Sequence, residues 1–243
     1  CQSYVRFNER DIPKDNWNME WSTQLVIVEN QKEFSKFSKE FHQYDSVTIP
    51  IQCDENKHPI DTKLCLLYVK MLDGDLNEYV LPFRHTDSIN LDPEKYIDLS
   101  WSPKNKYTYD KKKLLHFFDW KNVYDVQINH YLKTNEPLQL DDVSTNAHEY
   151  FHRKYYNKAN VNCIIPIMKH IEWCRKMVDK IKLCVFTGTK ETESIFNIYN
   201  SEVLESLQSI ESNGLQTLDG MVYSEYNPYT ATGRPSNRFG GIN

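Results

Sequence analysis

The sequence has few of the features that mark specialised protein classes. It holds only seven glycines in 243 residues, and five of them lie at or after residue 214, which indicates a change of organisation near the C-terminal end. No apolar run approaches the ~18 residues of a membrane span, so no membrane partner is expected. The six cysteines form no C-x-x-C pair and lie mostly in apolar segments, which favours reduced thiols over a disulfide scaffold.

The composition is that of an ordinary globular protein. Hydrophobic residues make up 40% and charged residues 26% of the chain, which is long enough for one large domain or two small ones. The net charge of −5 does not by itself indicate nucleic-acid binding. It does not exclude such binding either, because contacts to phosphates depend on a local basic patch.

The first half of the chain predicts a sheet. Residues 1–22 are a polar lead-in, and 23–30 predict a short buried strand. The segment 31–44 carries phenylalanines at three- and four-residue spacing and predicts an amphipathic helix. Three further strands are predicted at 46–53, 63–72 and 78–85, and the short turns between them favour an antiparallel meander.

The second half predicts mainly helices. Residues 114–132 suggest a strand followed by a helix, and helices are predicted at 141–156, 166–181 and 201–215. Gly214 would close the last of these helices as its C-cap. The pattern as a whole predicts an α/β domain over residues 23–185 and the start of a second unit over 186–243.

A zinc motif offers one alternative function. The segment "HEYFH" at 148–152 matches H-E-x-x-H, in which His148 and His152 would bind zinc and Glu149 would act as general base of a metallopeptidase. Arg153 and the lysine after it oppose this reading, because cations beside Zn²⁺ repel it. Downstream candidates for a third ligand are His170, Glu172, Glu191 and Glu193.

The most specific stretch is "YTATGRPSNRFGGIN" at 229–243. It resembles the T-x-T-G-R-[LP]-S segment of family A DNA polymerases, most closely that of phage members. The resemblance implies contacts to the backbone of primer–template DNA, and arginine and glycine suit such contacts by bonding phosphates and by allowing close approach. The DNA-binding residues it implies are Thr230, Thr232, Gly233, Arg234, Ser236, Asn237 and Arg238.

The segment 204–227 strengthens this resemblance, because it is similar to the helix, glycine stop and strand that open the polymerase domain of the family. The family's catalytic aspartates follow this motif, so the chain is expected to be a fragment without palm catalytic residues. No cofactor is expected on the fragment, and Mg²⁺ would belong to the complete polymerase. The implied partners are primer–template DNA and the remainder of the polymerase domain, in the cytoplasm of a bacterial host if the gene is phage-encoded.

Residues 23–185 are similar in plan to the ribonuclease-H-like 3′–5′ exonuclease domain that precedes the polymerase domain in this family. A proofreading enzyme needs Asp-x-Glu on the first strand to hold two metal ions, and Pro50 and Gln52 stand at those positions. No Y-x-x-x-D motif occurs, and Asp125 is a vestige of the middle motif that is one residue short. We therefore predict an exonuclease-like domain without catalysis. Asp54 and Glu55 give an alternative alignment, which the opposite facing of adjacent strand residues argues against.

A basic stretch gives one more candidate contact. Phosphate bonding and base stacking could hold single-stranded DNA, and a solvated lysine loop is the alternative interpretation. The residues are Tyr107, Tyr109, Lys111, Lys112 and Lys113. A third class of function, a non-catalytic DNA-binding or scaffold module, also fits the sequence.

Overall fold

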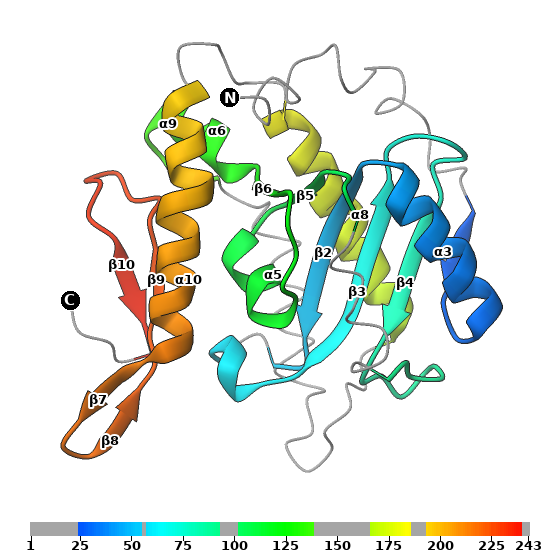
Figure 1. Cartoon of the computed structure of the whole chain (residues 1–243), viewed down its shortest axis with the longest axis horizontal. Coiled ribbons are helices and arrows are strands. Elements are labelled where there is room, and N and C mark those ends of the chain that lie inside the picture. Colours follow the sequence, from blue (N-terminus) through cyan, green and yellow to red (C-terminus); the bar gives the residue numbers. More distant parts are fainter. Residues whose placement is uncertain (1–23, 55–56, 93–101, 139–165, 186–192, 240–243) are drawn as a thin grey trace.

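A mixed sheet of six strands lies at the centre of the molecule (Figure 1). The computed structural model describes residues 24–54, 57–92, 102–138, 166–185 and 193–239. In spatial order the strands are β1 (Leu25–Ile27), β4 (Glu78–Pro82), β3 (Leu64–Met71), β2 (Ser46–Gln52), β5 (Lys106–Thr108) and β6 (Val123–Asp125).

The strands β2, β3 and β4 form the antiparallel meander that the sequence predicts. β5 runs parallel to β2, and β6 runs parallel to β5. The strand predicted within 23–30 is β1, which joins the other edge of the sheet parallel to β4. The predicted α/β class and the predicted meander are therefore both confirmed.

One face of the sheet packs against α3 (Gln31–Gln43) and α5 (Lys111–Phe117). The side chain of Asn30 accepts hydrogen bonds from two backbone N–H groups in the first turn of α3, which satisfies donors that a helix start leaves open. Phe37 and Phe41 of α3 are fully buried, and the Phe37 ring lies 5.2 Å from the Tyr79 ring of β4. Leu114 brings α5 into the same apolar cluster.

The opposite face is covered by α6 (Gln127–Thr134) and by α8 (Ile167–Val185), which runs behind the sheet in Figure 1. Ile171 and Met177 of α8 share a buried cluster with β2 and with Ile128 of α6. Although α8 has 19 residues, none of the helices in the described part of the chain is long and apolar enough to cross a membrane.

A helical column and two hairpins follow the sheet. The column consists of α9 (Glu193–Asn197), the π-helical η4 (Ile198–Val203) and α10 (Leu204–Asn213), and Gly214 ends it with a φ of 64°. The predicted helix with its glycine C-cap is thus confirmed. The hairpins pair β7 (Leu215–Thr217) with β8 (Gly220–Val222), and β9 (Glu225–Asn227) with β10 (Ser236–Arg238).

The C-terminal segment packs on the same core as the sheet. Phe196, Leu204 and Tyr229 are buried within the cluster that α6, α8 and β2 form. The division at residues 185 and 186 stays a prediction, and the described part of 186–243 rests directly on the exonuclease-like part. Two predicted segments, 1–22 and 141–156, lie outside the described residues.

Between residues 104 and 126 the elements in the structure differ from those that the sequence predicts. Its predicted strand and helix over 114–132 correspond to β6 and α6, but the segment begins inside α5, a helix that the pattern did not indicate. Asp110 caps α5 through its side chain, which accepts from Lys113 N at 3.0 Å. The sequence did not predict α5 because the helix begins with three consecutive lysines, and its apolar residues start only at Leu114.

Candidate functional site

Asp125, at the end of β6, is a buried carboxylate near the C-terminal segment. Its side chain is 1% exposed and accepts hydrogen bonds from the backbone N–H groups of Lys111 at 3.0 Å and Gln127 at 2.9 Å. Its own N–H donates to the side-chain oxygen of Asn200, which ties β6 to η4. Asp125 therefore connects β6 to α5, α6 and η4. In the sequence, only a partial motif indicated this residue.

Burial dominates the chemistry of this carboxyl group. It raises the pKa of Asp125 to about 8, and the negative charge of Asp110 adds to the shift. The two backbone N–H donors and Lys112 act in the opposite direction and are weaker.

A polar cavity of about 250 Å³ opens beside Asp125. Two further carboxylates line it, those of Asp110 and Glu225, together with Lys112 and Arg238. Burial raises the pKa of Glu225, Asp110 adds to the rise, and Arg238 opposes it. The cavity thus brings Asp125, which the sequence predicts to be a vestige of an exonuclease motif, and Arg238, at the end of the terminal motif, to one place.

The central strand β2 carries no carboxylate on either face. Val47, Ile49 and Ile51 pack into the cluster with α6 and α8. Because side chains alternate along a strand, Pro50 belongs to the opposite face. The pairing shifts register between Ile51 and Gln52, and the Gln52 amide donates to the carbonyls of Asp54 and Lys57, both at 2.8 Å. Whichever face is considered, this strand offers no charged ligand.

The alternative pair of acids follows directly after this strand. Asp54 is buried, and Glu55 lies outside the described residues.

Two groups in the described part of the chain bring three potential metal ligands within 4.8 Å of one another. They are Cys65 with His85 and His170, and His58 with His116 and Glu211. Neither contains more than one carboxylate, and neither includes Asp125.

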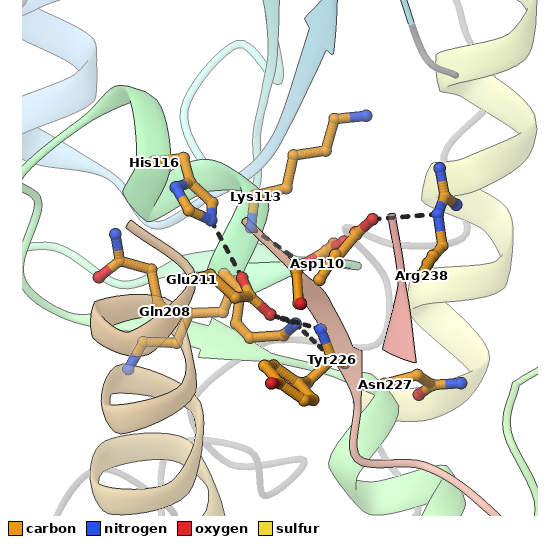
Figure 2. A network of polar contacts seen from close by, with 12 residues as sticks. Asp110, Lys113, His116, Gln208, Glu211, Tyr226, Asn227 and Arg238 are labelled. Atoms are coloured by element: carbon orange, nitrogen blue, oxygen red, sulfur yellow. Dashed lines mark hydrogen bonds and ion pairs between the residues drawn. The ribbon is translucent and has the colours of Figure 1, made fainter. Parts of the chain in front are cut away.

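The group around Glu211 is a hydrogen-bonded junction, as Figure 2 shows. The Glu211 carboxylate of α10 is 1% exposed and contacts Lys112 Nζ at 2.5 Å and His116 Nε2 at 3.0 Å, both from α5. It also accepts from Tyr226 N at 2.8 Å. Burial would raise the pKa of Glu211, but the bonds from His116 and Lys112 outweigh burial, so the pKa is lowered. This junction holds α5, α10 and β9 together.

Three residues of the predicted single-stranded DNA contact are buried in the structure. Tyr107 is fully buried in β5. Lys111 is 3% exposed and bonds to Asn200 O at 2.5 Å and to Glu205 at 2.9 Å. Lys112 is engaged by Glu211 and by the carbonyl of Tyr226. Lys111 and Lys112 thus connect α5 to the C-terminal segment, whereas Tyr109 and Lys113 are half-buried. The single-stranded DNA contact of these residues stays a prediction.

The terminal motif forms the hairpin between β9 and β10. Thr230 opens its turn, accepting from Gly233 N at 2.9 Å and donating through Oγ1 to Arg234 O at 2.6 Å. Gly233 has a φ of 71°, a conformation that favours glycine. The side chain of Arg234 is exposed, whereas Arg238 contacts Glu225 at 3.2 Å. Exposed residues of the motif also include Thr232 and Ser236, and Asn237 is half-buried.

The zinc motif of the sequence, His148 and His152, lies outside the described residues. Among its candidate third ligands, His170 is buried in α8 and belongs to the group with Cys65 and His85. Glu172 lies on α8 and bonds to Lys169 on the exposed side of that helix. The sequence therefore identified His170 as a possible ligand but gave no signal for its two neighbours.

Comparison with known proteins defines the fold. No family model matches the chain, and no curated protein matches it. Among solved structures, RNase D of Trypanosoma brucei is 11% identical with a TM-score of 0.51, over 80% of this chain and 72% of that one. Its complex with GMP also gives 11% and 0.51, over 79% of this chain and 63% of that one. NrnC of Brucella melitensis with bound Mg²⁺ is 14% identical with a TM-score of 0.45, over 79% and 92%.

The likeness to RNase D agrees with the sheet described above. The chain has the ribonuclease-H-like fold of 3′–5′ exonucleases, with a mixed sheet covered by helices. The fold class predicted from the meander is therefore confirmed. A family A polymerase and a phage origin receive no support from these matches, and they stay proposals.

The buried carboxyl of Asp125 predicts a specific pH dependence of stability. Its pKa is 3.8 when unperturbed and about 8 in the folded chain, so the folded state binds the proton more strongly. This contribution to stability is fully present below pH 3.8 and is lost as the pH rises through about 8. Asp125→Asn cannot ionise, so it should lose less stability than the parent between about pH 5 and about pH 9.

Urea unfolding followed by circular dichroism at both pH values measures this difference. Asp119→Asn is the matched control, because the Asp119 side chain is 94% exposed. The control should keep the pH dependence of the parent. Equal pH dependence in the parent and in Asp125→Asn would show that the carboxyl is ionised in the folded chain.

Proposed function

We propose that this chain is a non-cleaving, nucleic-acid-binding exonuclease-like domain that leads into a DNA polymerase domain of family A type. The observation that carries the proposal is that β2, the central strand of a 3′–5′ exonuclease fold, supplies no carboxylate, although Asp110, Asp125 and Glu225 line one cavity beside β6. Hydrolysis by two metal ions requires several carboxylates around adjacent ions. The potential ligand groups in the described residues hold at most one each, and β2 supplies none.

The state of Asp125 supports the same conclusion. Both carboxylate oxygens of Asp125 already accept hydrogen bonds from the backbone, from Lys111 N at 3.0 Å and from Gln127 N at 2.9 Å. Two backbone N–H groups and Asn200 use this residue to position β6 and η4. Asp125 hence serves the structure in a place where an active relative would use it for catalysis.

The polymerase part of the proposal rests on the terminal motif. Thr230 and Gly233 form a turn that leaves Thr232, Arg234 and Ser236 exposed on the β9–β10 hairpin. Arginine can bond a phosphate through two N–H groups, and hydroxyl groups add further donors. In this proposal the backbone of primer–template DNA lies along the hairpin. The Mg²⁺ ions for nucleotide addition belong to the remainder of the polymerase domain.

Arg234→Ala should weaken binding of primer–template DNA without changing sequence preference, because phosphate contacts carry no direct sequence information. The slope of log K against log[salt] should fall in magnitude by about 0.9 for the lost phosphate contact. Arg238→Ala should have a smaller effect, since Glu225 already offsets its charge. Fluorescence anisotropy over a salt series measures both quantities.

The matched control is Lys36→Ala, which removes an exposed cation from α3, near the opposite edge of the sheet from the β9–β10 hairpin (Figure 1). It should leave the salt slope unchanged. If Arg234→Ala and Lys36→Ala give the same affinity and slope as the parent, the hairpin does not hold the DNA backbone. If both lower the slope equally, binding is nonspecific attraction to charge, and the assignment from the motif is wrong.

A further inference from the structure

Three buried metal-binding side chains meet on the α8 face of the sheet. Cys65 lies on β3, His85 follows β4, and His170 lies in the first turn of α8. Each is at most 1% exposed, and their ligand atoms all lie within 4.8 Å of one another. The rings of His85 and His170 are 5.7 Å apart and nearly perpendicular, at 80°. Cys65 and His85 are 20 positions apart in the sequence, and His85 and His170 are 85 apart, but the fold brings the three side chains together.

The donor set selects the kind of metal. One thiolate and two imidazoles suit Zn²⁺, whereas Mg²⁺ and Ca²⁺ prefer oxygen ligands. Zinc binds sulfur at about 2.3 Å and nitrogen at about 2.0–2.1 Å, so two ligand atoms on a tetrahedral ion lie about 3.3–3.6 Å apart. The present separations are therefore within about 1.5 Å of that geometry, a distance that side-chain rotation can close.

The backbone around the cluster is already fixed. The Asn90 side chain accepts from His85 N at 2.7 Å and donates to His85 O at 3.0 Å, which holds that residue from both sides. The first turn of α8 is tied to the same loop, because Ile167 N donates to Asp87 Oδ2 at 3.2 Å. Arg175 of α8 grips Glu78 of β4 through two bonds of 2.9 and 2.7 Å. These hydrogen bonds connect α8 to β4 and to the loop that carries His85, which fixes the backbone positions of the ligands.

We propose that Cys65, His85 and His170 bind one Zn²⁺ ion, with water in the fourth position, and that the ion links β3, β4 and α8. Binding deprotonates the Cys65 thiol and releases that proton to solvent, so affinity should fall as the pH is lowered. The three ligands are at most 1% exposed, so the ion would lie inside the core. This role is distinct from the carboxylate-bound metals of an exonuclease and from the zinc motif at residues 148–152.

The second group of potential ligands, around His58 and His116, forms a network of hydrogen bonds. His58 Nε2 lies 3.1 Å from Ser224 O, and His58 Nδ1 accepts from Ile60 N at 3.2 Å. His116 bonds to Glu211 and, through Nδ1, to Ser212 Oγ at 3.2 Å. Both rings therefore have protein partners at each nitrogen within the junction that joins α5 and α10.

The test uses the full chain, stripped of metal with a chelator and then titrated with Co²⁺ and Zn²⁺. One Co²⁺ per chain should give the visible absorption of a tetrahedral site and a near-ultraviolet thiolate-to-cobalt band, and Zn²⁺ should displace it. Cys65→Ser should abolish the thiolate band. His170→Gln should weaken binding by more than the roughly 10–100-fold that the loss of an outer hydrogen-bond partner costs.

The chain offers matched controls. Cys53→Ser and Cys174→Ser replace two other buried, reduced cysteines outside the cluster and should leave the thiolate band unchanged. His148→Ala should also leave it unchanged. Loss of the band in His148→Ala, or its persistence in Cys65→Ser, would overturn the proposal by assigning the metal to other ligands. Absence of any tetrahedral Co²⁺ spectrum in the parent chain would overturn it as well.

A second measurement needs no variant and so does not depend on the folding of the mutants. Asp87 N donates to His85 Nδ1 at 3.1 Å. Binding of zinc through Nε2 places the ring proton on Nδ1, which removes the acceptor that this amide uses. The Asp87 amide resonance should therefore shift on addition of one equivalent of Zn²⁺. An Asp87 resonance that stays in place, with the parent chain fully titrated, would contradict binding through Nε2 of His85.

Discussion

The central constraint in this molecule is the position of β2. It pairs with β3 on one side and β5 on the other, helices cover both of its faces, and all seven of its residues are buried. A charged side chain in such a place is stable only with a bound metal or a counter-charge. Active exonucleases of this plan meet that condition with metal ions. Here the strand is apolar or neutral throughout, so the fold holds together without them.

The same logic explains how the C-terminal segment docks. Its interface with α5 contains charges that are buried but paired, with Lys112 and His116 against Glu211, and Lys111 against Asn200 and Glu205. A buried pair contributes little net stability, yet the loss of one partner leaves an uncompensated charge. The interface therefore specifies one arrangement of α5, α10 and the terminal hairpin, and through it the polar cavity beside Asp125.

The sequence predicted what depends on local pattern. Alternating and continuous apolar runs gave the meander β2–β3–β4, and the spaced phenylalanines gave α3. Gly214 gave the end of α10, because only a residue that tolerates positive φ ends a helix in that way. The sequence also showed that Pro50 and Gln52 stand where the exonuclease carboxylates are expected. Ile49 and Ile51 belong to the opposite face of β2, so that face offers no carboxylate either.

What the sequence could not show depends on partners far along the chain. A run of three lysines looks the same in the sequence whether it faces water or, as Lys111 and Lys112 do, meets Asn200, Glu211 and Tyr226 in the folded chain. Lys106 is likewise fully buried against three carbonyls, and burial lowers its pKa to about 8. The convergence of Cys65, His85 and His170 had no local signal, because three separate elements supply it.

The central claim, an exonuclease fold that does not cleave, is tested most directly by incubating the full chain with labelled single-stranded DNA and RNA in the presence of Mg²⁺ or Mn²⁺. Because β2 supplies no carboxylate and no group of three potential ligands among the described residues contains more than one, the parent chain should leave both strands at full length, as should Asp125→Asn. Stepwise shortening from the 3′ end by the parent, absent with Asp125→Asn, would show that Asp125 belongs to a working two-metal site and would contradict the account.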